Sequence, residues 1–244
     1  MNGRKNTWGN FSYEKSFHSF VPLNMITIEN DTRGRIRSKA AEMFMKWGVR
    51  SVSMDDIANA LGASKKTLYQ YFSDKNELVD AVVEQIVREN QSACDFDRLE
   101  ASNAIEEVFK AMDMMDVMFH NMNPSILYDL QKYHPKAYSR FLKHKNDYLY
   151  TVIHSNLERG IAEQLFRDDI NVELLSRFRV ESIMMFFNPD FLGKQKFNFA
   201  EVQQKIMEHF LFGVASLKGH KLILKYQQER EKKSSKHETG SKVK

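Results

Sequence analysis

From Thr32 to beyond Leu217, apolar residues recur every three or four positions, and this helical period limits the fold more than any other feature. No segment alternates apolar and polar residues as a half-buried strand does, and the sequence contains no internal repeat. Ten glycines and four prolines in 244 residues are also few for an all-β domain, which needs many turns. The sequence therefore predicts an all-α protein.

Residues that start or stop helices divide the first part of this pattern. The expected helices run from Thr32 to Gly48, from Ser53 to Gly62, from Ser64 to about Tyr71, and onward from Asp74. Asp56 follows Ser53 by three residues, which is close to a capping box. These start and stop residues predict a series of short helices in the N-terminal part of the chain.

The rest of the chain predicts longer helices. The first is expected at residues 105–122, and a short one follows the Asn123-Pro124 break and ends at residue 130. The others are expected from 135 to 161, from 172 to 187, and from 199 past 217. The polar stretch 92–102 is a candidate joint between two parts of the protein. Residues 1–30 read as a poorly ordered extension, with Met25 as an alternative start, and the basic tail 227–244 is expected to be disordered.

Residues 53–72 have the layout of a helix-turn-helix. Ala58 is small where two helices would cross, and Gly62 lets the backbone turn. Apolar side chains hold such a crossing at Ile57, Leu61, Leu68 and Tyr71. The start of the third helix is polar and would enter the major groove of DNA. An ordinary pair of short surface helices could share this spacing, but the preceding helix is rich in arginine, which favours DNA binding.

Residues from about Thr32 to Ile86 resemble the N-terminal domain of the tetracycline-repressor (TetR/AcrR) family of bacterial regulators. The segments Ser53-Met-Asp-Asp-Ile-Ala and Thr67-Leu-Tyr-Gln-Tyr-Phe-Ser-Asp-Lys-Asn-Glu-Leu78 carry the resemblance. It implies a helix-turn-helix DNA-binding domain over residues 31–78 and a helical ligand-binding and dimerisation domain over 79–226. It further implies a cytoplasmic, ligand-responsive regulator that binds a palindromic double-stranded DNA operator as a homodimer. The resemblance favours a repressor.

The resemblance also implies which residues contact DNA, mostly at phosphates. They are Ser53, Ser64, Thr67, Tyr69, Gln70 and Lys75. Lys65 and Lys66 fill positions that vary in the family, and we infer base contacts for them because lysines at this end of the helix can reach guanine edges.

A hydrophobic or amphipathic small-molecule effector is expected in the second part of the chain, where the helix at residues 105–122 is rich in methionine and phenylalanine. The expected lining residues are Met112, Met115, Phe119, Tyr128, Tyr148 and Met185. For any single methionine, ordinary core packing is the stronger interpretation. Binding would rotate the fourth helix through the joint at 92–102 and so change the distance between the two reading helices.

The final helix is apolar on two sides, which suggests a core on one side and a second protomer on the other. The expected dimer-interface residues are Phe186, Leu211, Phe212 and Ala215. The alternative is that these residues complete a monomeric core.

Other chemistries find little support in the sequence. A lone Cys94 excludes an intrachain disulfide and a multi-cysteine zinc site, and it favours a reducing compartment. His134, His144 and His154 lie on different sides of a helix, so no metal or other cofactor is expected. We find no catalytic motif and no apolar stretch of membrane-spanning length. The alternative function is an all-α small-molecule-binding or interaction protein without an operator.

Net charge alone does not identify a partner. The chain carries +4, but residues 218–244 contain nine basic and three acidic side chains, so the remainder is slightly acidic. The case for DNA therefore rests on where Lys65, Lys66, Lys75 and the stretch Arg33–Lys39 lie.

Overall fold

The computed structural model describes residues 32–120, 122–185, 187 and 199–240, so the expected extension over residues 1–30 lies outside them. Within these residues the only extended pairing is an isolated bridge between Phe166 and Ala215, and the all-α prediction is confirmed. None of the described helices combines the length and the apolar content needed to span a bilayer. The helices are α2 (Thr32–Trp47), α3 (Met54–Leu61), α4 (Lys65–Tyr71), α5 (Lys75–Glu100), α6 (Ala104–Phe119), α7 (Ile126–Tyr133), α8 (Pro135–Lys143), the π-helical turn η1 (His144–Leu149), α9 (Tyr150–Ala162), α10 (Val172–Met185), α12 (Phe199–Val214) and α13 (Leu217–Gly240).

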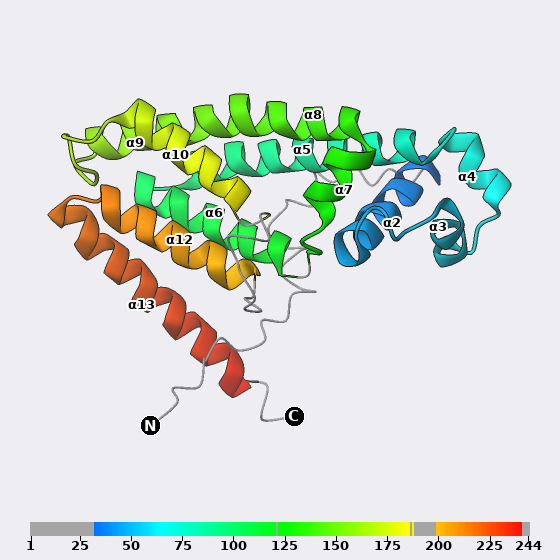
Figure 1. Cartoon of the computed structure of the whole chain (residues 1–244). Coiled ribbons are helices and arrows are strands. Elements are labelled where there is room, and N and C mark those ends of the chain that lie inside the picture. The colour runs from blue at the N-terminus through cyan, green and yellow to red at the C-terminus, as the bar shows by residue number, and fades with distance from the viewer. Residues whose placement is uncertain (1–31, 121, 186, 188–198, 241–244) are drawn as a thin grey trace, which may run out of the picture.

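The helices α2, α3 and α4 form a group at one end of the molecule, and α5 leads away from that group along its length (Figure 1). On its way α5 packs against α2, then against α8 and α6. The helices α6, α9, α10, α12 and α13 make up the opposite end (Figure 1). The helix α5 thus leads from one end to the other, and α8, which packs against it, continues through η1 into α9.

The helix α5 runs without a break to Glu100. The polar stretch from residue 92 is therefore helical where a joint was expected, and the chain turns only at residues 101–103. Asn103 caps α6 there by accepting hydrogen bonds from the backbone of Ile105 and Glu106. Polar residues could stay in the helix because most of their side chains lie on its exposed sides.

Two expectations for the C-terminal helices are wrong. The helix expected from 199 past 217 is interrupted between Val214 and Leu217, where its backbone pairs with the α9–α10 loop. Arg167 N donates to Val214 O and Ser216 N donates to Leu165 O, each at 2.9 Å. The second is the expected disorder from 227 onward, since α13 continues to Gly240.

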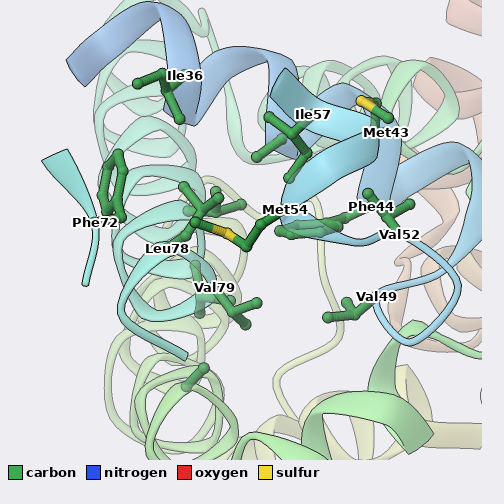
Figure 2. Close-up of a cluster of buried hydrophobic side chains, with 14 of the residues drawn as sticks. Ile36, Met43, Phe44, Val49, Val52, Met54, Ile57, Phe72, Leu78 and Val79 are labelled. Carbon is green, nitrogen blue, oxygen red and sulfur yellow. The ribbon is translucent and has the colours of Figure 1, made fainter. Parts of the chain in front are cut away.

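Two groups of buried side chains hold the fold together. The N-terminal core joins α2, α3, α4 and the start of α5, and Figure 2 shows Ile36, Phe44, Ile57, Phe72 and Leu78 converging within it. Side chains of α7 and α8 belong to the same core. The second core lies among α6, α9, α12 and α13. The helices α7 and α8 are thus packed together with α2–α4 in one core.

Candidate functional site

The start of α3 is fixed by a reciprocal pair of hydrogen bonds. Asp56 N donates to Ser53 Oγ at 3.1 Å, and Ser53 N donates to a carboxylate oxygen of Asp56 at 2.8 Å. This is the capping box that the sequence predicted. The hydrogen bond from Ser53 lowers the pKa of the Asp56 carboxyl. Ser53, an expected DNA contact, thus lies exposed at a helix N-terminus.

The turn between α3 and α4 needs a residue with a positive φ, and Gly62 supplies it at 63°. Two residues later Ser64 caps α4, accepting from Thr67 N at 3.1 Å while the two hydroxyls lie 2.8 Å apart. Both Ser64 and Thr67, expected to contact DNA, therefore have hydroxyls committed to shaping the start of α4. Ser64 is exposed and Thr67 is half-buried.

The inner side of α4 is locked into the N-terminal core by Leu68 and Phe72, neither of which is accessible to solvent. Tyr71, expected to hold the helix crossing, instead lies at the surface with 36% of its area exposed. Phe72, the extended residue that ends α4, takes that place and is fully buried. Helical spacing from Leu68 does not distinguish the two rings, because positions three and four residues later are both its neighbours.

The outer side of α4 presents Lys65, Lys66, Tyr69 and Gln70, all exposed, with half of the Tyr69 side chain open to solvent. Lys65 forms an ion pair with Asp55 of α3, whose hydrogen bond raises the lysine's pKa. The structure thus brings the four predicted reading residues together on one short helix, opposite its buried side.

Lys75 lies at the start of α5 and is less accessible. Its ammonium donates to the carbonyl of Arg50 at 3.4 Å, and burial lowers its pKa although Asp129 and Asp56 oppose that effect. The amine therefore lies near the backbone that leads into α3.

The six predicted ligand-lining residues fall into separate places. Met115 and Phe119 share a cluster on α6, and Met112 lies in the second core. Tyr148 donates to Gln91 O at 2.9 Å and to an Asp95 oxygen at 2.6 Å, so it is held against α5. More than half of Tyr128 is exposed on α7, and Met185 is exposed at the end of α10. The structure gathers the α6 residues and leaves the tyrosines and Met185 apart from them.

Two surface cavities in the described part of the chain lie elsewhere. One of about 550 Å³ lies between the α9–α10 loop and the α12–α13 turn, lined by Gln164, Arg167, Asp168 and His220 among others. The second, of about 430 Å³, lies between η1 and α10 beside Tyr150 and Arg177. Neither contains any of the six predicted lining residues.

The predicted dimer residues differ in accessibility. Leu211 and Ala215 are buried inside the protomer, so their assignment to a surface between two copies is wrong. Phe212 packs edge-on against His220, and Phe186 lies outside the described residues. On α10, in contrast, two apolar side chains one turn apart are exposed: Leu174 to 61% and Phe178 to 56%. The ring of Phe178 stacks on Phe210 of α12 at 6.5 Å.

The remaining reactive groups are structural. His134 and His144 are buried, and each hydrogen-bonds an asparagine of α5, at 2.7 Å to Asn76 and at 2.9 Å to Asn90. Burial raises the pKa of the Cys94 thiol to about 12, which keeps it protonated at neutral pH. Among the described residues no group of histidine, cysteine or carboxylate side chains is arranged to hold a metal ion.

Comparison with known proteins gives a consistent set of relatives. A family model described as "Bacterial regulatory proteins, tetR family" matches residues 36–82. The chain is 31% identical over 170 residues to the HTH-type transcriptional regulator YvaF of Bacillus subtilis, covering 68% of this chain and 87% of that protein. It is 26% identical over 156 residues to the HTH-type transcriptional repressor KstR2 of Mycobacterium tuberculosis, covering 61% and 76%.

Solved structures share the fold. The ketosteroid transcriptional regulator KstR2 of Mycobacterium tuberculosis aligns with a TM-score of 0.51 at 20% identity, covering 77% of this chain and 96% of that one. A transcriptional regulator of Saccharomonospora viridis in complex with choline aligns with a TM-score of 0.63 at 16% identity, covering 77% and 100%. Both matches extend well beyond residues 36–82, so the second part of the chain shares its arrangement of helices with them.

Proposed function

The chain belongs to the TetR family of bacterial regulatory proteins, and from this membership we propose that it is a ligand-responsive repressor that binds a palindromic operator as a homodimer. Proteins of this family are helix-turn-helix transcriptional regulators and not enzymes, as the sequence predicted. The operator, the dimer and the effector are the parts of the proposal that go beyond family membership.

One observation carries the proposal for DNA. The helix α4 buries Leu68 and Phe72 completely and exposes Lys65, Lys66, Tyr69 and Gln70 on its other side. A helix held this firmly by its inner side can enter the major groove without losing its own packing. Lysines at its start supply phosphate or guanine contacts, and Tyr69 and Gln70 add hydrogen bonds. The DNA phosphates around this helix are then contacted by Ser53, Ser64, Thr67 and Lys75.

A homodimer follows from the small size of this surface. One seven-residue helix makes few base contacts, so operator specificity requires a second copy about 34 Å away. The exposed residues Leu174 and Phe178 of α10, with Phe210 of α12 stacked beneath, form the apolar surface that we assign to the partner protomer. Phe212 lies on α12 outside this surface.

The effector acts, in this proposal, through the second part of the chain. One solved relative, the regulator of Saccharomonospora viridis, is in complex with choline, and KstR2 is a ketosteroid transcriptional regulator. The choline complex supports a small-molecule effector for this fold. To release DNA, the effector of this chain must bind the DNA-incompetent arrangement more tightly than the competent one.

The test uses DNA from upstream of the chain's own gene in a fluorescence-anisotropy titration at several salt concentrations. Specific binding that weakens steeply with salt, by a factor that reports the number of phosphates contacted, supports the proposal. Replacing Tyr69 by Ala should weaken binding while leaving the circular-dichroism spectrum unchanged, and Tyr133→Ala on α7 provides the control. Equal affinity for operator and scrambled DNA would instead favour the alternative, an all-α binding protein without operator function.

A further inference from the structure

The inner face of α10 carries a charge that nothing in the described protein neutralises. Only 3% of Arg179 is exposed, and its guanidinium makes two hydrogen bonds among the described residues: Nη1 to Ser182 Oγ at 2.8 Å and Nε to the sulfur of Met207 at 3.3 Å. No carboxylate of the described part forms an ion pair with it. Burial alone lowers the pKa of Arg179, to about 10, so the group stays charged at neutral pH.

A second polar group lies unsatisfied on the helix that Arg179 faces. Gln203 of α12 is buried, its amide nitrogen donates to the sulfur of Met115 at 2.8 Å, and its amide oxygen has no partner in the described structure. Gln203 precedes Met207 by one helical turn, so the two project from the same side of α12. The interior between α10 and α12 therefore contains both an unneutralised cation and a free acceptor.

The surroundings of these two groups are apolar and adaptable. Met207 of α12 contacts Arg179 and Met115 of α6 contacts Gln203, and both belong to the second core together with Met112 of α6. A thioether accepts hydrogen bonds only weakly, so sulfur atoms are poor partners for a guanidinium and an amide. Methionine side chains change rotamer easily, which allows this interior to open around a small molecule.

An unpaired buried charge strongly destabilises a protein, and a stable fold normally neutralises it. The planar fork of an arginine matches a carboxylate in two parallel hydrogen bonds. Among the described residues burial is the sole influence on the Arg179 pKa, and no second cation acts on it. One arginine alone suits a single negative charge better than the two of a phosphate.

We infer that the effector is an amphipathic monocarboxylic acid, whose carboxylate binds the guanidinium of Arg179 and whose apolar body lies against Met112 and Met115 of α6. This inference rests on the proposed function for the existence of an effector, and it names the chemistry of its head group. The carboxylate of the acid binds on the inner face of α10, and the outer face of the same helix carries Phe178. A shift of α10 on binding thus passes to the surface assigned to the second protomer.

The test compares ligands that share one apolar chain and differ only at the head. Full-length protein, freed of co-purified lipid, is titrated with dodecanoate, dodecanol and dodecyl phosphate, and binding is followed by calorimetry and thermal unfolding. The acid at about 100 times its Kd should raise the Tm by about 5 to 10 °C, and the alcohol should raise it less. Equal binding of acid and alcohol, or tighter binding of the phosphate, overturns the inference.

Matched variants locate the head group. Arg179→Met should lower the affinity for dodecanoate by about 10-fold to 100-fold and leave that for dodecanol unchanged. Arg177→Met, an exposed arginine on the same helix, should change neither. Without ligand, Arg179→Met should unfold at the same temperature as the wild type or higher, because it removes an unneutralised charge. A lower Tm for this variant together with unchanged acid binding assigns Arg179 a purely structural role and rejects the site.

Operator binding measured on the same preparations separates the two proposals. Specific DNA binding that no acid alters, in a protein that binds no acid, overturns this inference and leaves the DNA-binding proposal standing. Acid binding that depends on Arg179, in a protein that binds no DNA, does the opposite.

Discussion

Arg140 of α8 grips Asp80 of α5 with both prongs of its guanidinium: Nε lies 3.2 Å from one carboxylate oxygen and Nη2 3.2 Å from the other. Lys136, one turn earlier on α8, contacts the same carboxylate at 2.8 Å. Asp80 lies only two residues after Leu78, which is part of the N-terminal core. This ion pair therefore joins α8 to the part of α5 that packs against the DNA-binding helices.

Replacing Asp80 by Asn should lower the free energy of unfolding at pH 7 by about 1 to 3 kcal/mol, because Arg140 loses a charged acceptor that is largely shielded from water. Burial raises the pKa of Asp80, but its hydrogen bonds and charges with Arg140 and Lys136 prevail, so the folded-state pKa lies below 3.8. A depressed pKa gives stability that is present above the unfolded-state value and is lost as the pH falls through the folded-state value. Urea unfolding at pH 7 and near pH 3 should therefore show a difference between wild type and variant that shrinks at the lower pH.

Lys66 and Lys65 should behave differently in DNA binding. Lys66→Ala should weaken operator binding and reduce the slope of log affinity against log salt by about 1, since one phosphate contact is lost. Asp55→Asn should do the reverse, because it frees Lys65 from its ion pair and removes a negative charge beside the DNA. Anisotropy titrations across a salt series measure both, with Lys221→Ala on the distant helix α13 as control. If Asp55→Asn weakens binding, the ion pair positions Lys65 instead of competing for it.

Gly62 should resist substitution by Ala more than by Asn. A Cβ at Gly62 would meet no atom within 4 Å, so any cost comes from its φ of 63° alone. That conformation costs an alanine about 1 to 2 kcal/mol, whereas asparagine adopts it readily. Chemical unfolding of the two variants provides the comparison, and equal stabilities would show that the turn relaxes.

Phe178→Glu should convert the proposed dimer to monomers, because it places a charge in the apolar surface on α10. Leu224→Glu on α13 is the matched control, since Leu224 is exposed to a similar degree and lies outside that surface. Size-exclusion chromatography with light scattering distinguishes the outcomes. A wild-type protein that elutes as a monomer would remove the surface's proposed role.

The sequence predicted the DNA-binding end well because local rules decide it. Ser53, Gly62 and Ser64 act on residues within three or four positions of themselves, through capping hydrogen bonds and a positive φ. The exposed side of α4 follows from the same helical spacing. Only the exchange between Tyr71 and Phe72 was missed, where a shift of one position decides which ring is buried.

The second part of the chain depends on contacts between distant residues. The break after Val214 involves backbone hydrogen bonds with residues 165–167, some fifty positions earlier. The local signal there is Ser216, whose hydroxyl accepts from Gly219 N at the start of α13, and it was missed. The burial of Leu211 and Ala215 also depends on contacts with residues distant in the sequence. Arg179 has arginine, phenylalanine and glutamate neighbours typical of an exposed helix, so its burial is visible only in the structure.

The π-helical turn at His144–Leu149 sits within one continuous helical run from Pro135 to Ala162. Each residue of an α-helix turns the chain by about 100°, and a π-turn holds one residue more than the α-helical turn it replaces. The side chains that follow the π-turn are therefore rotated about the helix axis by about one residue position relative to those before it. With this rotation α8 packs against α5 and α9 packs against α10. Deleting one residue here would restore a plain α-helix and re-aim every side chain of α9, so in aligned relatives this extra residue and the partners of α9 should be gained or lost together.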